Sequence, residues 1–86
     1  MKIKEGFSLK EVAGKTIIVA SGERALNFNK IIHINYSGKL LFEALSVGKS
    51  EKELVQILLD TYDVSEAVAR KDVKIFIQML QMNDIV

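Results

Sequence analysis

The chain carries few side chains that could do chemistry, and they form no recognisable catalytic set. His33 is the only histidine, and cysteine is absent. A zinc site takes about four Cys, His or carboxylate ligands, and no cluster has the spacing to supply them. Ser, His and Asp all occur, but nothing resembles a nucleophile elbow or an activated triad. We therefore predict that the protein is not an enzyme and uses no metal and no cofactor.

What remains is recognition by apolar surface, and the last predicted helix, from about Glu66 to Met82, carries two apolar lines. The first line follows 3.6-residue spacing and is bordered by Ile77; it consists of Ala69, Val73, Phe76 and Leu80. The second line consists of Val68, Asp72, Ile75 and Met79. One line is enough to pack a helix on a core, so the second lies under another element or forms the wall of an exposed groove. Asp72 favours the groove, because an unpaired buried carboxylate is costly.

Composition bounds the protein to one small domain over residues 1–86. With 49% hydrophobic residues in so short a chain, we expect some large apolar side chains to face a partner. The net charge of +1 provides no general field for nucleic acid or membrane. No apolar run approaches the roughly 20 residues of a spanning helix, and no signal-peptide pattern opens the chain. These features predict a cytoplasmic protein.

The elements that must position these residues begin with strands. Residues 7–12 alternate apolar and polar side chains, Ala13-Gly14-Lys15 is a short turn, and residues 16–20 form an apolar run that completes a hairpin. After a polar break at residues 21–24, we predict a third strand from about Leu26 to Ile34. Within it, Ile32 and Ile34 share one face and Ile31 and His33 the other, and alternation alone leaves open which face meets the helices.

Three helices follow. Asn35 caps the first, which spans roughly Tyr36 to Leu45 and ends near Gly48. Ser50-Glu-Lys-Glu53 is a capping box that starts a helix to about Tyr62, and Ser65 caps the last. The predicted fold is α+β and winged-helix-like, with a three-stranded antiparallel sheet followed by three helices in the order β-β-β-α-α-α. Such a sheet leaves at least one strand edge unpaired.

At this level of detail the sequence resembles the PqqD-like family, small domains also called RiPP recognition elements. The likeness runs through the hairpin, the junction Ile34-Asn35-Tyr-Ser-Gly38, the capping box at Ser50, residues 62–65, and Asp72-Val73 followed by Phe76-Ile77 and Leu80. Two departures are Phe42, where many relatives have Trp or Leu, and Val47, where an Asp is common. The order and spacing of the matching segments make the likeness specific.

The resemblance implies a function and partners. It implies that the domain binds the leader segment of a ribosomally made precursor peptide and presents it to a modifying enzyme, such as a radical S-adenosylmethionine enzyme or a leader protease and cyclase. The leader would add as a strand beside the third strand and pack against the last helix, by β-augmentation. The residues expected to contact it are Asn29, Lys30, Ile31, Ile32, His33, Ile34, Val68, Lys71, Asp72, Ile75 and Met79.

Two other interpretations of the same segments stay open. Residues 62–65 join two helices in the manner of a helix-turn-helix, and Arg70, Lys71 and Lys74 would then face DNA, which makes a winged-helix regulator the alternative. The near-neutral charge argues against it, because DNA binding normally needs a clustered excess of Lys and Arg. The free strand edge could also pair with that of a second copy, which gives a homodimer.

Overall fold

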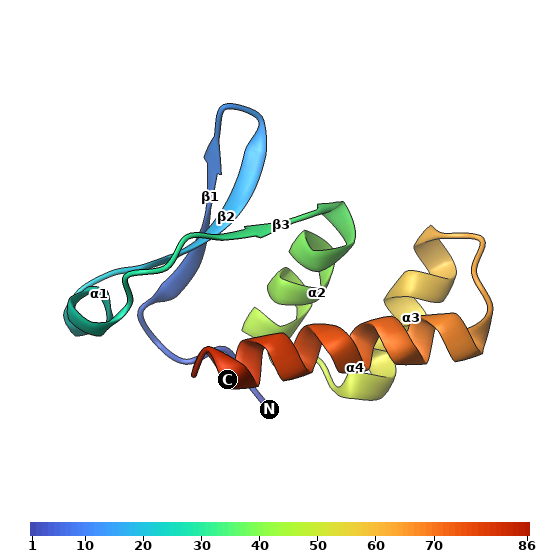
Figure 1. The fold of residues 1–86 in the computed structure, drawn as a ribbon. Coiled ribbons are helices and arrows are strands. Elements are labelled where there is room, and N and C mark those ends of the chain that lie inside the picture. The colour runs from blue at the N-terminus through green and yellow to red at the C-terminus, as the bar shows by residue number, and fades with distance from the viewer.

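A three-stranded antiparallel sheet and a layer of helices make up the computed structural model, which describes all 86 residues (Figure 1). The strands are β1 (Phe7–Val12), β2 (Lys15–Ala20) and β3 (Ile32–Ile34), in the order β1-β2-β3. The helices are α1 (Glu23–Asn27), α2 (Tyr36–Ser46), α3 (Glu51–Thr61) and α4 (Glu66–Met82). The α+β class and the antiparallel sheet are as predicted, and the sheet is followed by α2, α3 and α4.

The β1–β2 hairpin closes with a two-residue turn. Val12 pairs with Lys15, and both intervening residues have positive φ, 52° at Ala13 and 79° at Gly14. This is the backbone of a type I′ turn, whose twist matches that of the strands it joins. Glycine adopts positive φ freely, whereas at Ala13 the side chain makes it costly.

The predicted third strand from Leu26 to Ile34 is wrong over residues 26–31. Residues 23–27 form the short helix α1 instead, Leu26 is 80% exposed, and the strand begins only at Ile32. The cause is tertiary, because Arg24 donates from Nε to the Glu5 carbonyl at 3.2 Å and lies 5.6 Å from the centre of the Phe7 ring. The element order is therefore β-β-α-β-α-α-α, with one helix more than predicted.

Side-chain caps fix the starts of the three long helices, as predicted. Asn35 Oδ1 accepts from the Gly38 amide at 2.9 Å, and Ser65 Oγ accepts from the Val68 amide at 3.2 Å. Ser50 and Glu53 form the complete capping box. Because Asn35 alone separates the end of β3 from the start of α2, its cap sets the angle at which the sheet meets the helices.

The register of the sheet shows which face of β3 is buried. Ile32 pairs with Ile18, which is 1% exposed, and both Ile32 and Ile34 are half-buried against the core. His33 pairs with Ile17 on the other face and is exposed, as is Ile31. The face of β3 that carries Ile32 and Ile34 therefore meets the helices.

One predicted line of α4 forms the centre of the core, with one correction. Ala69, Val73 and Leu80 are fully buried, as predicted. Ile77, expected at the border, is buried at 4%, whereas Phe76, expected within the line, is half-buried. The buried line of α4 therefore includes Ile77, and the Phe76 ring lies at the edge of the core.

Candidate functional site

The sheet has two free edges, and they differ in their surroundings. β3 pairs with β2 on one side only, so its other edge offers unpaired backbone groups. β1 is the other free edge, and its outer half carries the exposed, charged Lys10 and Glu11, which discourage strand pairing. In Figure 1, β3 and α4 lie along the same face of the molecule with α2 behind them.

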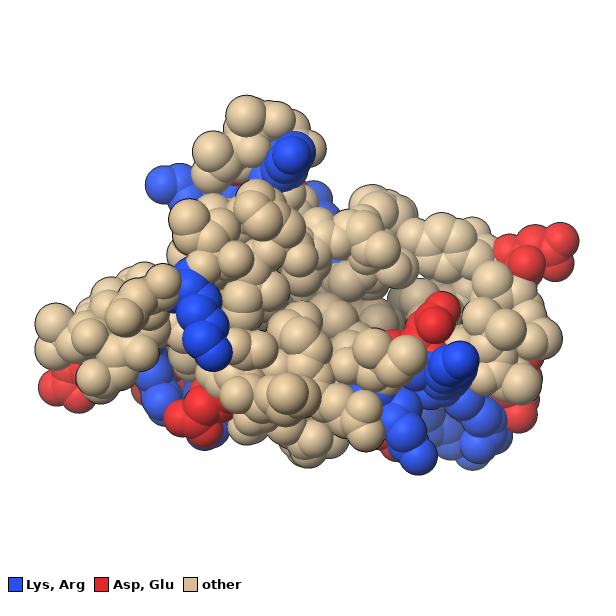
Figure 2. Space-filling model, in the orientation of Figure 1, with Lys and Arg blue, Asp and Glu red and all other residues tan.

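A groove of about 390 Å³ lies where β3 meets the helices. Its lining comes from the end of β3, the first turns of α2, one residue of α3 and the middle of α4. The lining residues are His33, Ile34, Asn35, Ser37, Gly38, Leu41, Leu58, Asp72, Ile75, Phe76 and Met79. Figure 2 shows this face as mainly uncharged and hollowed, with Lys and Arg gathered at its lower right.

The second line of α4 faces this groove rather than the core. Ile75 is 53% exposed and Val68 is 46% exposed, while Met79 is half-buried. These are large apolar side chains with free contact surface. Asp72, Ile75 and Met79 line the groove itself, and Val68 extends the same stripe by one turn. The line is thus a groove wall, which is one of the two options that the sequence left open.

The residues that precede β3 form an exposed approach to the edge. Asn29, Lys30 and Ile31 lie outside the strand, and Ile31 is 72% exposed. Lys30 Nζ donates to Asn83 Oδ1 at 2.8 Å, which ties this segment to the C-terminal end of α4. Lys71 does not line the groove; with Arg70 and Lys74 it borders a separate hollow between α3 and α4.

Sequence reasoning missed the floor of the groove. Leu41 and Leu58 are almost fully buried, and their apolar character alone indicated only core. Gly38 is the more informative residue, because a Cβ there would lie 3.1 Å from Ile34 Cβ and 3.3 Å from the Phe76 ring. Because Gly38 has no Cβ, β3, α2 and α4 can approach one another closely at this point. In the sequence, the strand-to-helix junction around Asn35 was the signal that could have placed Gly38 at the site.

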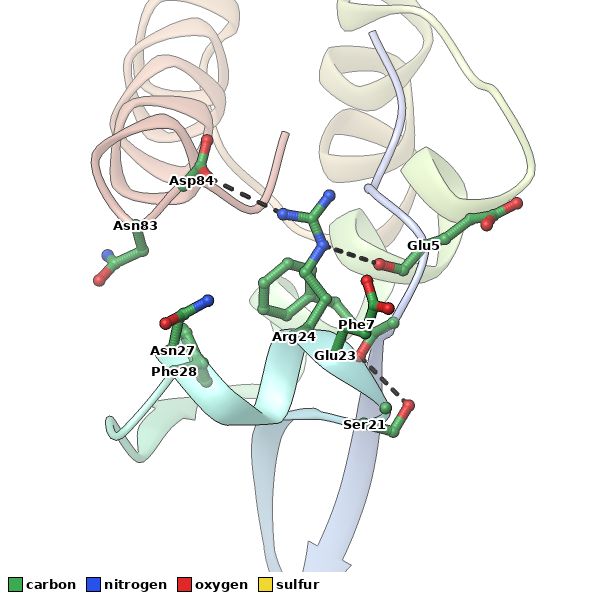
Figure 3. A pocket seen from close by; sticks show the side chains of 11 residues that line it. Glu5, Phe7, Ser21, Glu23, Arg24, Asn27, Phe28, Asn83 and Asp84 are labelled. Carbon is green, nitrogen blue, oxygen red and sulfur yellow. Dashed lines mark hydrogen bonds and ion pairs between the residues drawn. The ribbon is translucent and has the colours of Figure 1, made fainter.

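A second hollow, near the chain termini, is held together by charge pairs (Figure 3). Arg24 reaches Asp84 at 3.9 Å, and Lys4 pairs with the same carboxylate. The hydrogen bond from Lys4, with its positive charge, lowers the pKa of Asp84. The rings of Phe7 and Phe28 meet edge to face at 5.2 Å. These contacts anchor α1 and the segment leading to β3, so we interpret this hollow as structural.

The structure contains no group of three or more His, Cys, Asp or Glu side chains placed to hold a metal ion. None of its helices combines the length and the apolar character needed to cross a membrane.

A comparison with models of known protein families finds a match over most of the chain. The model of the family described as Coenzyme PQQ synthesis protein D (PqqD) matches residues 16–86. The chain belongs to the PqqD family. The match includes β2 from its second residue onward, β3 and all of α2, α3 and α4, so every lining residue of the groove falls within it. The predicted resemblance is confirmed, and no curated protein matches the chain.

Among solved structures, the PqqD-family fold is matched by one described as TbiB1 in complex with the TbiA(beta) leader peptide. The TM-score is 0.80, and the alignment covers 99% of this chain and 93% of that one. The sequences are 18% identical, so the likeness is one of fold. It extends over both the sheet and the helices that build the groove.

Proposed function

We propose that this protein binds the leader segment of a ribosomally made precursor peptide and presents it to a modifying enzyme. The observation that carries the proposal is the free edge of β3 beside an apolar groove walled by α4. Membership of the PqqD family and a fold shared with a protein solved in complex with a leader peptide support it. Because precursors are made on ribosomes, the encounter would take place in the cytoplasm.

The mode of binding follows from the two walls of the site. An extended peptide adds beside β3 and exchanges backbone hydrogen bonds with its free edge. Alternate side chains of an extended strand point to opposite faces, so every second peptide side chain is directed at α4. There it meets Ile75, Met79 and the half-buried Phe76. The residues proposed to contact the peptide are Asn29, Lys30, Ile31, Ile32, His33, Ile34, Val68, Asp72, Ile75 and Met79. Lys71, which was expected in this set, borders the separate hollow between α3 and α4 and is not part of the proposed contact surface.

The groove supports a binding function rather than catalysis. Its titratable lining groups are His33 and Asp72, which come from different walls and are joined by no side-chain hydrogen bond. The modifying enzyme would therefore supply the chemistry, and this domain would hold the peptide in place. A flexible leader loses conformational freedom on binding, so we expect micromolar to sub-micromolar affinity.

Neither comparison favours the DNA-binding alternative. One of the basic residues of α4, Arg70, also forms an ion pair with Glu66 at 3.0 Å, which reduces the positive charge available to contact DNA. A DNA-binding domain would bind duplex at low salt and lose affinity steeply as salt rises. Titration of a labelled duplex at low salt tests this directly, and we expect no saturable binding.

The test of peptide binding uses the short reading frames that neighbour the gene. Their products are synthesised and titrated into isotope-labelled protein, and backbone amide signals are followed. We expect shifts concentrated in residues 31–35 and 68–79. Shifts concentrated on the β1 edge or on the Lys71 side of α4 would show that the groove is not the site.

A further inference from the structure

The groove holds one charged group without a partner. Asp72 takes part in none of the five ion pairs and in none of the side-chain hydrogen bonds. The residues three and four positions away on α4 are Val68, Ala69, Ile75 and Phe76, all apolar. The helix itself therefore offers this carboxylate no donor.

Asp72 also lies between two hollows. It lines the groove beside β3, and it lines an adjoining hollow of about 310 Å³. The second hollow is walled by Tyr36, Tyr62 and Val64, from the start of α2 and the loop between α3 and α4. Asp72 and Leu58, with Asn35 and Ser37, are shared by the two. A peptide that fills the groove from one hollow to the other must pass over Asp72.

Covering Asp72 with an uncharged peptide would remove water from the carboxylate without supplying a hydrogen bond or a positive charge in its place. A buried charge is tolerated only when it is paired and hydrogen-bonded. The free protein avoids the difficulty because Asp72 is exposed to solvent. The α4 side chains around Asp72 are apolar. Of the polar groups that share its two hollows, Ser37 already donates to Asn35, and the Tyr36 and Tyr62 hydroxyls make no hydrogen bond to Asp72. In the bound state we therefore expect the partner to come from the peptide.

We propose that the groove selects leader segments in which a Lys or Arg lies two positions from a large apolar residue. This deepens the proposed function and rests on it. Ile75 and Phe76 lie about 4.5 and 6 Å along the helix axis from Asp72, at 1.5 Å per residue. Neighbouring side chains on one face of a strand are about 6.6 Å apart. For a peptide that runs along α4, an apolar side chain against Phe76 therefore places the next side chain on that face at Asp72.

The experiment selects a displayed library of random 12-residue peptides against the wild-type protein and, in parallel, against Asp72→Asn and Asp72→Lys. Wild type is expected to enrich Lys or Arg two positions from an apolar residue. Asp72→Asn is expected to keep the preference for the apolar residue and to lose the preference for Lys or Arg. Asp72→Lys is expected to prefer Asp or Glu at the position where wild type prefers Lys or Arg. For a selected peptide, changing its basic residue to Gln should weaken binding about 10- to 100-fold.

Glu43→Gln is the matched control, because it removes the same charge from an exposed position of α2 that lines no groove. It should select the same peptides as wild type. Thermal unfolding confirms that the Asp72 variants fold, as expected for an exposed residue. Enrichment of one motif by wild type and Asp72→Asn alike would overturn the inference and leave peptide binding standing. Failure of every variant to enrich any groove-binding peptide would overturn both proposals.

Discussion

Replacing Ile75 by Glu separates a groove wall from a core position. Ile75 is 53% exposed, and its exposed half lies in the groove. Complete burial of an isoleucine contributes about 1.5–3 kcal/mol, so covering the exposed half contributes roughly 1–1.5 kcal/mol to peptide binding. A carboxylate facing an apolar peptide side chain adds a penalty of about 1–3 kcal/mol. The total, about 2–4.5 kcal/mol, weakens binding roughly 30- to 2,000-fold.

The stability of the free protein should change little in the same variant. Exposed substitutions usually alter the free energy of unfolding by about 0.5 kcal/mol or less. Isothermal titration with a selected or genome-encoded peptide measures binding, and urea unfolding measures stability. Val47→Glu serves as the control, because Val47 is apolar and 74% exposed but lines no groove. Unfolding of Ile75→Glu, or wild-type affinity in a folded Ile75→Glu, would refute the groove.

Three further predictions concern the scaffold, all measured by urea unfolding. Asn35→Ala removes the cap of α2 and should lower the free energy of unfolding by about 1 kcal/mol. Ala13→Asn suits the positive φ of the hairpin turn and should raise it by up to about 1 kcal/mol. Hydrogen bonds from the backbone and side chain of Ser50 lower the pKa of Glu53 below its ordinary value of 4.5. A lowered folded-state pKa means stability that is complete above pH 4.5 and is lost as the pH falls through the folded value. Glu53→Gln, which keeps the cap but does not titrate, should lose less stability over that acid range; an unchanged acid profile would contradict this assignment.

The long helices could be predicted closely because their boundaries are set by local chemistry. The Ser50 capping box and the Ser65 cap each satisfy amides within three residues, so the sequence around them is sufficient. The segment before β3 has no such side-chain cap to mark where its helix begins. Its helix α1 depends on Arg24 contacting Glu5, Phe7 and Asp84, residues far away in the sequence. No periodicity within residues 23–34 could reveal those contacts.

The site was predictable in part for the same reason. The apolar line of α4 with Asp72 inside it could be found from spacing, because one helix generates it alone. The floor at Leu41 and Leu58 and the close approach at Gly38 arise only when β3, α2 and α4 meet. The buried face of β3 likewise depended on its register with β2, which alternation in one strand does not fix.

The length of β3 limits how much of the free energy of peptide binding can come from the strand edge and how much must come from α4. With three residues in the strand, an added peptide gains about three backbone hydrogen bonds, each worth about 0.5–1.5 kcal/mol net. Micromolar affinity requires about 8.2 kcal/mol, so the edge supplies at most about half of it. The remainder must come from side chains covered on α4 and from the pairing of Asp72. A sheet edge of this length therefore sets the path of the peptide, while α4 supplies most of the affinity as well as the selectivity.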